Sequence, residues 1–120
     1  MKARLKQLLQ FKELTIQTTP NGFLPNLPLN GKWLEELGFT VGLGVGARFE
    51  NSCLTLTVGG ADLQVESRMI RKRPRTHLII NALWLKKYGF KVGDKVGLTL
   101  EHGQIQIQKI NKYTIAEQSA

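Results

Sequence analysis

The pattern of hydrophobic and polar positions changes from a helical to an alternating period twice along the chain. The stretches GKWLEEL and ALWLKKY each predict a helix of about two turns. Alternating residues after each helix predict a β-hairpin, formed by VGLGVGARFE and CLTLTV in the first case and by KVGLTLE and QIQIQKI in the second. A strand is expected before each helix, in ELTIQTT and THLII. The chain therefore contains the same predicted unit twice: a strand, a short helix and a hairpin.

The repetition extends to individual residues. Residues 28–57 align with residues 79–108 without gaps and share ten identities in thirty positions, where unrelated sequences of ordinary composition give about two. Such a repeat determines the architecture before any local assignment does. One unit is too small to bury its own hydrophobic faces, so we expect two copies to wrap around one another.

Both copies carry the same signals for the start and end of their helix. An asparagine precedes each helix, and its side-chain oxygen can accept hydrogen bonds from the N–H groups of the first turn. A glycine follows each helix, because glycine adopts the left-handed conformation without a Cβ penalty. The next residue, a phenylalanine, is expected to pack back on a leucine of the helix, and the tryptophans are expected to face the core. These residues are Asn30, Trp33, Leu34, Gly38 and Phe39 in the first copy, and Asn81, Trp84, Leu85, Gly89 and Phe90 in the second.

The repeated motif resembles a known superfamily. The second copy, with LIIN, GFKVGDKV and GQIQIQKI, is similar to the AbrB/MazE swapped-hairpin module, which is normally an intertwined homodimer. The first copy resembles one branch of that superfamily, the SymE-like toxins, in LTIQTTP, LPLNGKWLEELGF, Gly42, Val45 and CLTLTV. The resemblance covers about residues 13–58 and extends more loosely over 77–110. Ser52 stands where the family usually has glycine before the cysteine.

The resemblance implies a mainly β fold with short helices, in the form of an AbrB/MazE-like swapped-hairpin β-barrel. A single chain would form it as a pseudo-dimer, because the two copies are fused in tandem. The expected segments are an N-terminal tail or short helix at 1–12, a first repeat at 13–58, a basic connector at 59–76, a second repeat at 77–112 and a C-terminal tail at 113–120.

Charge points to an anionic partner. The chain carries a net charge of +8, with six Lys and Arg against four acidic residues in 1–60 and eleven against five in 61–120. This surplus favours nucleic acid over a membrane surface. The densest cluster is RMIRKRPR, and its basic residues are Arg68, Arg71, Lys72, Arg73 and Arg75.

We interpret this cluster as a phosphate-binding arm, because several neighbouring cations displace condensed counterions and the planar fork of arginine pairs with phosphate. A solvated linker and a sheet edge protected by charge are the alternatives. Pro74 argues against a central strand. The corresponding stretch of the first copy, QTTPNGFLP, is uncharged, so a nucleic-acid face built here is lopsided.

No catalytic constellation is visible. His77 and His102 are the side chains with near-neutral reference pKa values, and we expect both to be structural. Cys53 is expected to pack as a small hydrophobic residue. The lone cysteine and the scattered histidines predict neither a metal site nor a cofactor. With no apolar run of about 18 residues, a cytoplasmic protein is the simplest interpretation. Leu5, Leu8 and Leu9, together with Phe11, are expected to form the apolar face of a short helix that docks on the barrel.

The leading hypothesis is a nucleic-acid-binding protein that resembles the toxin of a SymE-type toxin–antitoxin system. The resemblance implies growth inhibition through RNA degradation or nucleoid binding, and it implies endoribonuclease activity that the residues themselves do not show. One alternative is a non-enzymatic AbrB/MazE-like DNA-binding transcription regulator or antitoxin. Another is a protein-binding module. A further homodimer and regulation by an antitoxin stay open.

Overall fold

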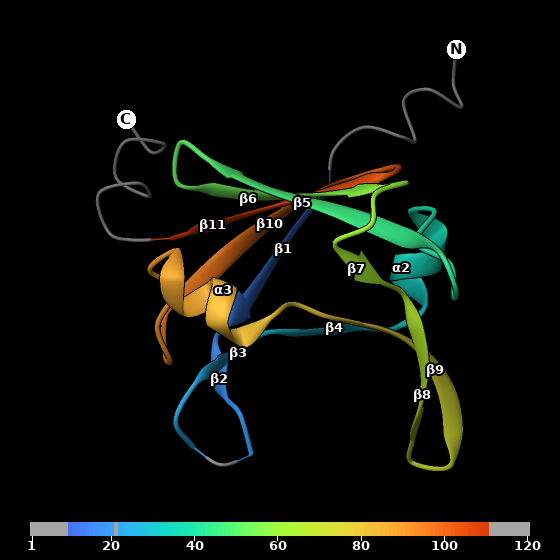
Figure 1. Cartoon of the computed structure of the whole chain (residues 1–120). Helices are drawn as coiled ribbons and strands as arrows, with labels where there is room; N and C mark the ends of the chain where they lie inside the picture. The colour runs from blue at the N-terminus through green and yellow to red at the C-terminus, as the bar shows by residue number, and fades with distance from the viewer. Residues whose placement is uncertain (1–9, 21, 111–120) are drawn as a thin grey trace.

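The computed structural model describes residues 10–20 and 22–110, and this part of the chain is mainly β with two short helices (Figure 1). The elements in chain order are β1 (Gln10–Thr15), β2 (Gln17–Thr18), β3 (Pro25–Asn26), β4 (Pro28–Asn30), α2 (Lys32–Glu36), β5 (Gly44–Glu50), β6 (Cys53–Val58), β7 (Leu63–Gln64), β8 (Glu66–Ile70), β9 (Arg73–Ile79), α3 (Ala82–Lys87), β10 (Lys95–Glu101) and β11 (Gln104–Lys109). β1 begins inside the segment expected to be an N-terminal tail or helix. Leu5, Leu8 and Leu9 and the expected tail at 113–120 lie outside the described residues.

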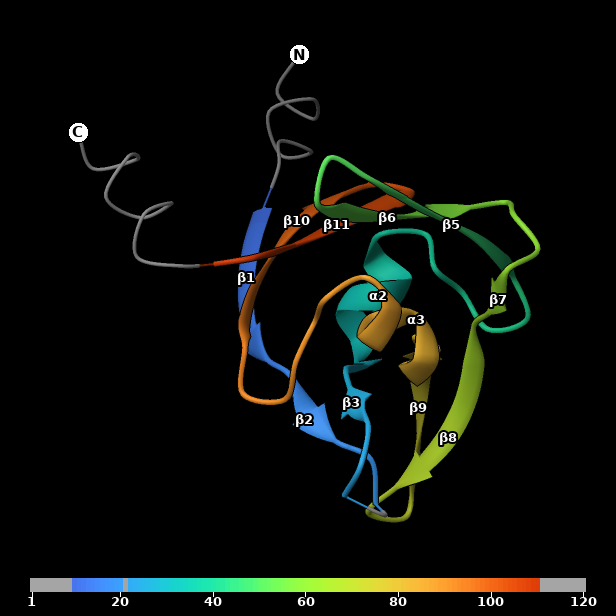
Figure 2. The same ribbon diagram turned by 60° about the vertical axis from the view of Figure 1, so that its left-hand side comes forward.

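One six-stranded antiparallel sheet has the order β1-β10-β11-β6-β5-β7. Both helices lie between this sheet and two smaller sheets, β2-β3 and β4-β9-β8 (Figure 2). The expectation of a closed β-barrel was wrong, because the large sheet has two edges, at β1 and β7. The chain leaves the sheet after each of these strands, at the buried residues Ile16 and Val65, and enters β2 and β8 instead of continuing around a barrel.

The pairing of β6 with β11 joins the two copies at the centre of the large sheet, and we call it the seam. Thr55 lies directly opposite Gln106, which is its own counterpart in the repeat alignment. A second such pair occurs below the helices, where Pro28 of β4 lies opposite Ile79 of β9. The register at both places is therefore unchanged when the two copies are exchanged.

The two outer strands, β1 and β7, also pair with the opposite half of the chain. β1 pairs with β10 of the second copy, and β7 pairs with β5 of the first. Matching backbone hydrogen bonds extend both contacts by one residue. They run from Ile16 N–H to Asp94 O (2.8 Å), from Gly93 N–H to Ile16 O (2.9 Å), from Val65 N–H to Leu43 O (3.0 Å) and from Gly42 N–H to Val65 O (2.8 Å). Each hairpin thus receives its outer neighbour from the other half of the chain.

Both helices end as the sequence predicts. Gly38 and Gly89 adopt φ of 93° and 88°, in the left-handed region that glycine tolerates. The N–H of the phenylalanine that follows donates to a carbonyl five residues earlier, from Phe39 to Leu34 O at 2.9 Å and from Phe90 to Leu85 O at 2.8 Å. This bond turns each phenylalanine into the core, where both side chains are buried.

The helix starts differ between the copies. Asn81 is the expected N-cap, because its Oδ1 accepts from the N–H groups of Leu83 and Trp84. The same expectation for Asn30 was wrong. Asn30 ends β4, its carbonyl accepts the indole N–H of Trp33 at 2.9 Å, and Gly31 with φ of 126° takes the N-cap position. A Cβ at Gly31 would lie 2.9 Å from Trp33 Cδ1, so the indole bond needs a glycine there.

The core draws on both copies. The two tryptophans are half-buried against it. Its fully buried members include Leu34, Phe39, Leu54 and Leu56 from the first copy, and Leu85, Phe90, Ile105 and Ile107 from the second.

Gly89 offers a test of the helix end. No atom lies within 4 Å of a Cβ added there, so Gly89→Ala introduces only the strain of a left-handed L-residue. We expect it to lower the free energy of unfolding by about 1–2 kcal/mol, measured by urea denaturation. Gly89→Asn should cost less, because asparagine tolerates this conformation. Unchanged stability of the alanine variant would contradict the assigned helix end.

Candidate nucleic-acid interface

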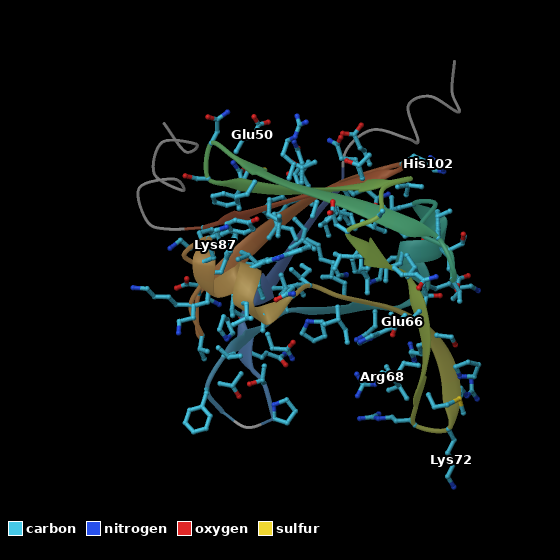
Figure 3. The ribbon with its side chains drawn as sticks, viewed as in Figure 1. Glu50, Glu66, Arg68, Lys72, Lys87 and His102 are labelled. Carbon is cyan, nitrogen blue, oxygen red and sulfur yellow. The ribbon has the colours of Figure 1, made fainter. Side chains whose placement is uncertain are left out.

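The basic residues singled out in the sequence lie together on one hairpin. We call this hairpin the basic arm; it consists of β8, the turn Arg71-Lys72 and β9 as far as His77. It extends from the molecule on the side away from the six-stranded sheet (Figure 3). The exposed basic side chains are Arg68, Arg71, Lys72, Arg73 and Arg75. The structure thus brings together all five residues expected to bind nucleic acid.

The register of the arm concentrates like charges. Arg68 lies directly opposite Arg75, and Arg73 shares their face because side chains alternate along a strand. Like charges directly opposite one another destabilise an antiparallel pair, by roughly 0.2–1 kcal/mol. The ion pairs between described residues all lie elsewhere, at Arg48–Glu50, Lys95–Glu13 and Lys109–Asp94. An anion placed between the guanidinium groups would relieve their repulsion.

The turn at the tip of the arm places two long cationic side chains in an unfavourable backbone conformation. Arg71 and Lys72 have φ of 52° and 67°. A two-residue hairpin turn with both φ values positive favours Asn-Gly, and an L-residue in the left-handed region costs about 1–2 kcal/mol. The turn therefore carries charge where another sequence would give more stability. Strain of this kind supports a functional hypothesis for the tip.

Pro74 is accommodated because of where it lies. It pairs with Met69 of β8, while β4 pairs with β9 only at residues 77–79. β9 is therefore the central strand of its sheet near His77 but an edge strand at Pro74, where a missing N–H disrupts no second ladder. The expected connector at 59–76 contains β7, β8 and the first part of β9, where the sequence predicts no strand before Thr76 and leaves a charged sheet edge as an alternative.

The root of the arm is anchored on the helix of the other copy. Thr76 is buried, and its hydroxyl donates to Glu35 Oε2 of α2. Its carbonyl accepts the N–H of Gly31 at 3.0 Å. Because both bonds reach the start or body of α2, the orientation of the arm is fixed by the first copy. The sequence contains no local signal for the Thr76–Glu35 contact, since 41 positions separate the two residues.

His77 lies at the root of the arm and is only 3% exposed. Its Nε2 lies 3.5 Å from Arg68 Nη1. A guanidinium can only donate, so this contact favours the tautomer with the proton on Nδ1, which is buried without a hydrogen-bond partner. Burial lowers the pKa of His77, Arg68 lowers it further, and Glu66 acts in the opposite direction. A neutral, covered imidazole orients Arg68 and is poorly placed to meet a phosphodiester.

His102 and Cys53 lie far from the arm in the fold. His102 occupies the exposed turn between β10 and β11, at the other end of the molecule from Arg68 and Lys72 (Figure 3). Cys53 begins β6, with its Sγ 3.8 Å from Thr55 Oγ1. Within residues 10–20 and 22–110, no group of three or more His, Cys, Asp and Glu side chains is arranged to hold a metal ion. The helices in this part of the chain are too short or too polar to cross a membrane.

The first copy has a hairpin in the equivalent place. β2 follows Ile16 as β8 follows Val65, and the β2–β3 hairpin extends from the same side of the molecule as the basic arm (Figures 1 and 2). Between β2 and β3 the sequence is TPNGFL, which has no charged residue. Two equivalent hairpins thus present different chemistry on one side.

Comparison with known proteins bears on the first copy. Residues 12–58 match the family model of the toxin SymE, of type I toxin–antitoxin systems. This segment runs from β1 to the end of β6 and excludes the basic arm. Two curated relatives, the endoribonucleases SymE of Salmonella paratyphi C and Salmonella choleraesuis, are each 47% identical over 34 residues. The alignment covers 28% of this chain and 31% of each relative. No solved structure gives a significant match.

The lowered pKa of His77 predicts a pH dependence of stability. As pH falls below about 6.5, the unfolded chain takes up a proton on this residue while the folded state resists it. The corresponding stability is therefore present above that pH and is lost as pH falls through the folded pKa. We expect His77→Gln to lose less stability than the wild type between about pH 7.5 and pH 5, measured by urea denaturation.

Between about pH 7.5 and pH 8.5, where His77 is neutral in both states, the two proteins should change in parallel. An equal loss of stability in the wild type and the variant on acidification would contradict the assigned environment of His77.

Proposed function

We propose that the protein binds nucleic acid through the basic arm and acts as a SymE-like toxin, inhibiting growth through RNA degradation or nucleoid binding. The observation that carries the binding proposal is the placement of Arg68 opposite Arg75 beneath a strained Arg71-Lys72 tip. Five exposed cations on one hairpin can release counterions from a nucleic-acid backbone. Arginine forks also suit phosphate oxygens, to which they donate bidentate hydrogen bonds.

The toxin part of the proposal rests on the first copy. Its match to the SymE family model, and the endoribonuclease activity for which the two relatives are named, support RNA as the target. In the described residues no acid–base pair accompanies the arm, since His77 is buried and His102 lies elsewhere. The proposed role of the arm is therefore to bind nucleic acid, and the proposal gives none of the described residues a catalytic role. A cytoplasmic location and control by an antitoxin belong to the same proposal.

The proposed architecture is a fused pseudo-dimer of the swapped-hairpin type, with repeats at 13–58 and 77–112 joined by the connector at 59–76. The symmetric register of the seam and the crossed pairing of β1 and β7 support it. A homodimeric module has two identical arms. In this chain, fusion allows one copy to keep charge that the other lacks.

A second function, DNA binding by a non-enzymatic regulator or antitoxin of the AbrB/MazE type, is favoured by the form of the arm. The major groove of B-DNA admits a two-stranded β-ribbon, and β8 and β9 form such a ribbon. One chain would then contact one half-site, and a palindromic site would require two chains. A preference for one duplex sequence would favour this function over the toxin.

Replacing Arg71, Lys72, Arg73 and Arg75 together by glutamine tests the arm. If each neutralises one phosphate, the slope of log K against log salt on duplex DNA should flatten by about 3 to 4 units, at about 0.9 per contact. The loss should be similar across sequences, because phosphate contacts carry no sequence information. Fluorescence anisotropy over a range of salt concentrations provides the slope.

A charge-matched comparison separates local from general electrostatics. The pair Arg73→Gln and Arg75→Gln should flatten the slope by about 2 units. The pair Arg48→Gln and Lys95→Gln removes the same charge from the six-stranded sheet and should leave the slope nearly unchanged. If the four-glutamine variant keeps the wild-type slope and folds normally by circular dichroism, the arm does not bind nucleic acid. A protein-binding module then becomes the better description.

A further inference from the structure

A second surface, on the side of the molecule from which the basic arm extends, has the chemistry of a nucleotide site. An open pocket of about 400 Å³ lies between the β2–β3 hairpin of the first copy and the end of α3 in the second. Its lining combines aromatic and aliphatic surface with two ammonium groups. The residues are Phe23, Pro25, Lys86, Gly89, Phe90, Lys91 and Val92.

Exposure of the lining makes it accessible to a ligand. The side chain of Phe23 is 83% exposed and Val92 is 48% exposed. Lys86 and Lys91 are also exposed, and the ion pairs between described residues do not include them. An aromatic ring beside cations is the arrangement by which proteins hold unpaired nucleotides, since the base stacks on the ring and the backbone meets the cations.

The corresponding surface of the first copy has different chemistry. In the repeat alignment, Glu35 takes the place of Lys86 and Thr40 takes the place of Lys91. Glu35 is already bonded to Thr76 at the root of the basic arm. The two copies therefore differ at both hairpins. One hairpin has five basic residues beside an acidic helix, and the other has an exposed phenylalanine beside a basic helix.

We infer that this pocket binds one unpaired nucleotide of a single-stranded nucleic acid, with its base stacked on Phe23 and its flanking phosphates on Lys86 and Lys91. The inference rests on the proposed function, because the basic arm would hold the same strand. Both hairpins extend from one side of the molecule (Figures 1 and 2), so a strand can cross from one to the other. In a duplex the faces of the bases are stacked on each other, so the pocket distinguishes single strands from duplexes.

Phe23→Ala tests the base contact in the full chain. With a fluorescein-labelled oligouridylate of about 12 nucleotides, affinity should fall by about 5- to 150-fold, the range expected for one base–aromatic stack. Affinity for a duplex of the same length should not change. Phe23→Trp should bind the single strand as well as the wild type. Phe11→Ala is the matched control, because Phe11 is 66% exposed but belongs to β1 of the large sheet.

Two further measurements separate the contribution of the base contact from that of the phosphate contacts. The pair Lys86→Gln and Lys91→Gln should flatten the salt slope on the single strand by about 1.4 units, at about 0.7 per contact. Phe23→Ala should leave that slope unchanged. On an oligonucleotide with abasic sites in place of its bases, Phe23→Ala should bind as the wild type does.

The outcomes distinguish this inference from the proposed function. Unchanged single-strand affinity in Phe23→Ala, with the arm variant still flattening the slope on duplex DNA, overturns the pocket and leaves the arm in place. An equal loss on the single strand, the duplex and the abasic strand also overturns the pocket, since stacking is then not the cause. A wild-type slope in the arm variant overturns the proposed function whatever Phe23 does.

Discussion

The backbone pairing of β6 with β11 is the contact on which the rest of the structure depends. Without it the large sheet divides into two three-stranded parts, β1-β10-β11 and β6-β5-β7. The seam joins them into one sheet, and Leu54, Leu56, Ile105 and Ile107 are fully buried beside it. Its register places Thr55 opposite Gln106, so the pairing is unchanged when the two aligned segments are exchanged. On either side of the seam, β1 and β7 pair with strands from the opposite half of the chain, and both helices lie beneath the joined sheet (Figure 2).

A symmetric frame holds two hairpins of different chemistry on the same side. The frame needs the residues that the copies share, because Gly38, Gly89 and the phenylalanines after them end both helices in the same way. The hairpins contribute little to the buried hydrophobic core, so the fold places few demands on the side chains at their tips. The basic arm accepts strain at its tip and like charges across its ladder, whereas the first-copy hairpin presents Phe23. This division would let one chain hold the backbone and the base of one strand at separate places.

Much of this could be predicted from sequence, where the signal is local. The two large hairpins, both glycine helix ends and the Asn81 cap follow from short-range patterns, and the five basic residues of the arm were identified by charge alone. Asn30 is not the N-cap of α2, because Gly31 occupies that position and the carbonyl of Asn30 accepts a hydrogen bond from the indole N–H of Trp33. β8 and the first part of β9 were not assigned as strands, because clustered charge and Pro74 argue against a central strand, although a charged sheet edge was one alternative. The pairing of β9 with β4, the pairing of β8 with β9 and the Thr76–Glu35 bond outweigh that local preference. The pocket at Phe23 has no local signal, since its walls come from both copies.

The central claim is that nucleic acid binds across the hairpin side of the molecule and leaves the six-stranded sheet free. Amide chemical shifts of the ¹⁵N-labelled full chain, titrated with a single-stranded RNA, test it most directly. We expect the largest changes in the β2–β3 hairpin, in the basic arm and at the end of α3. Thr55 and Gln106 project from the sheet away from the core, because their neighbours Leu54, Leu56, Ile105 and Ile107 point into it, and their amides should not move. Largest changes at Thr55 and Gln106, with the hairpin amides unmoved at saturating RNA, would contradict the account.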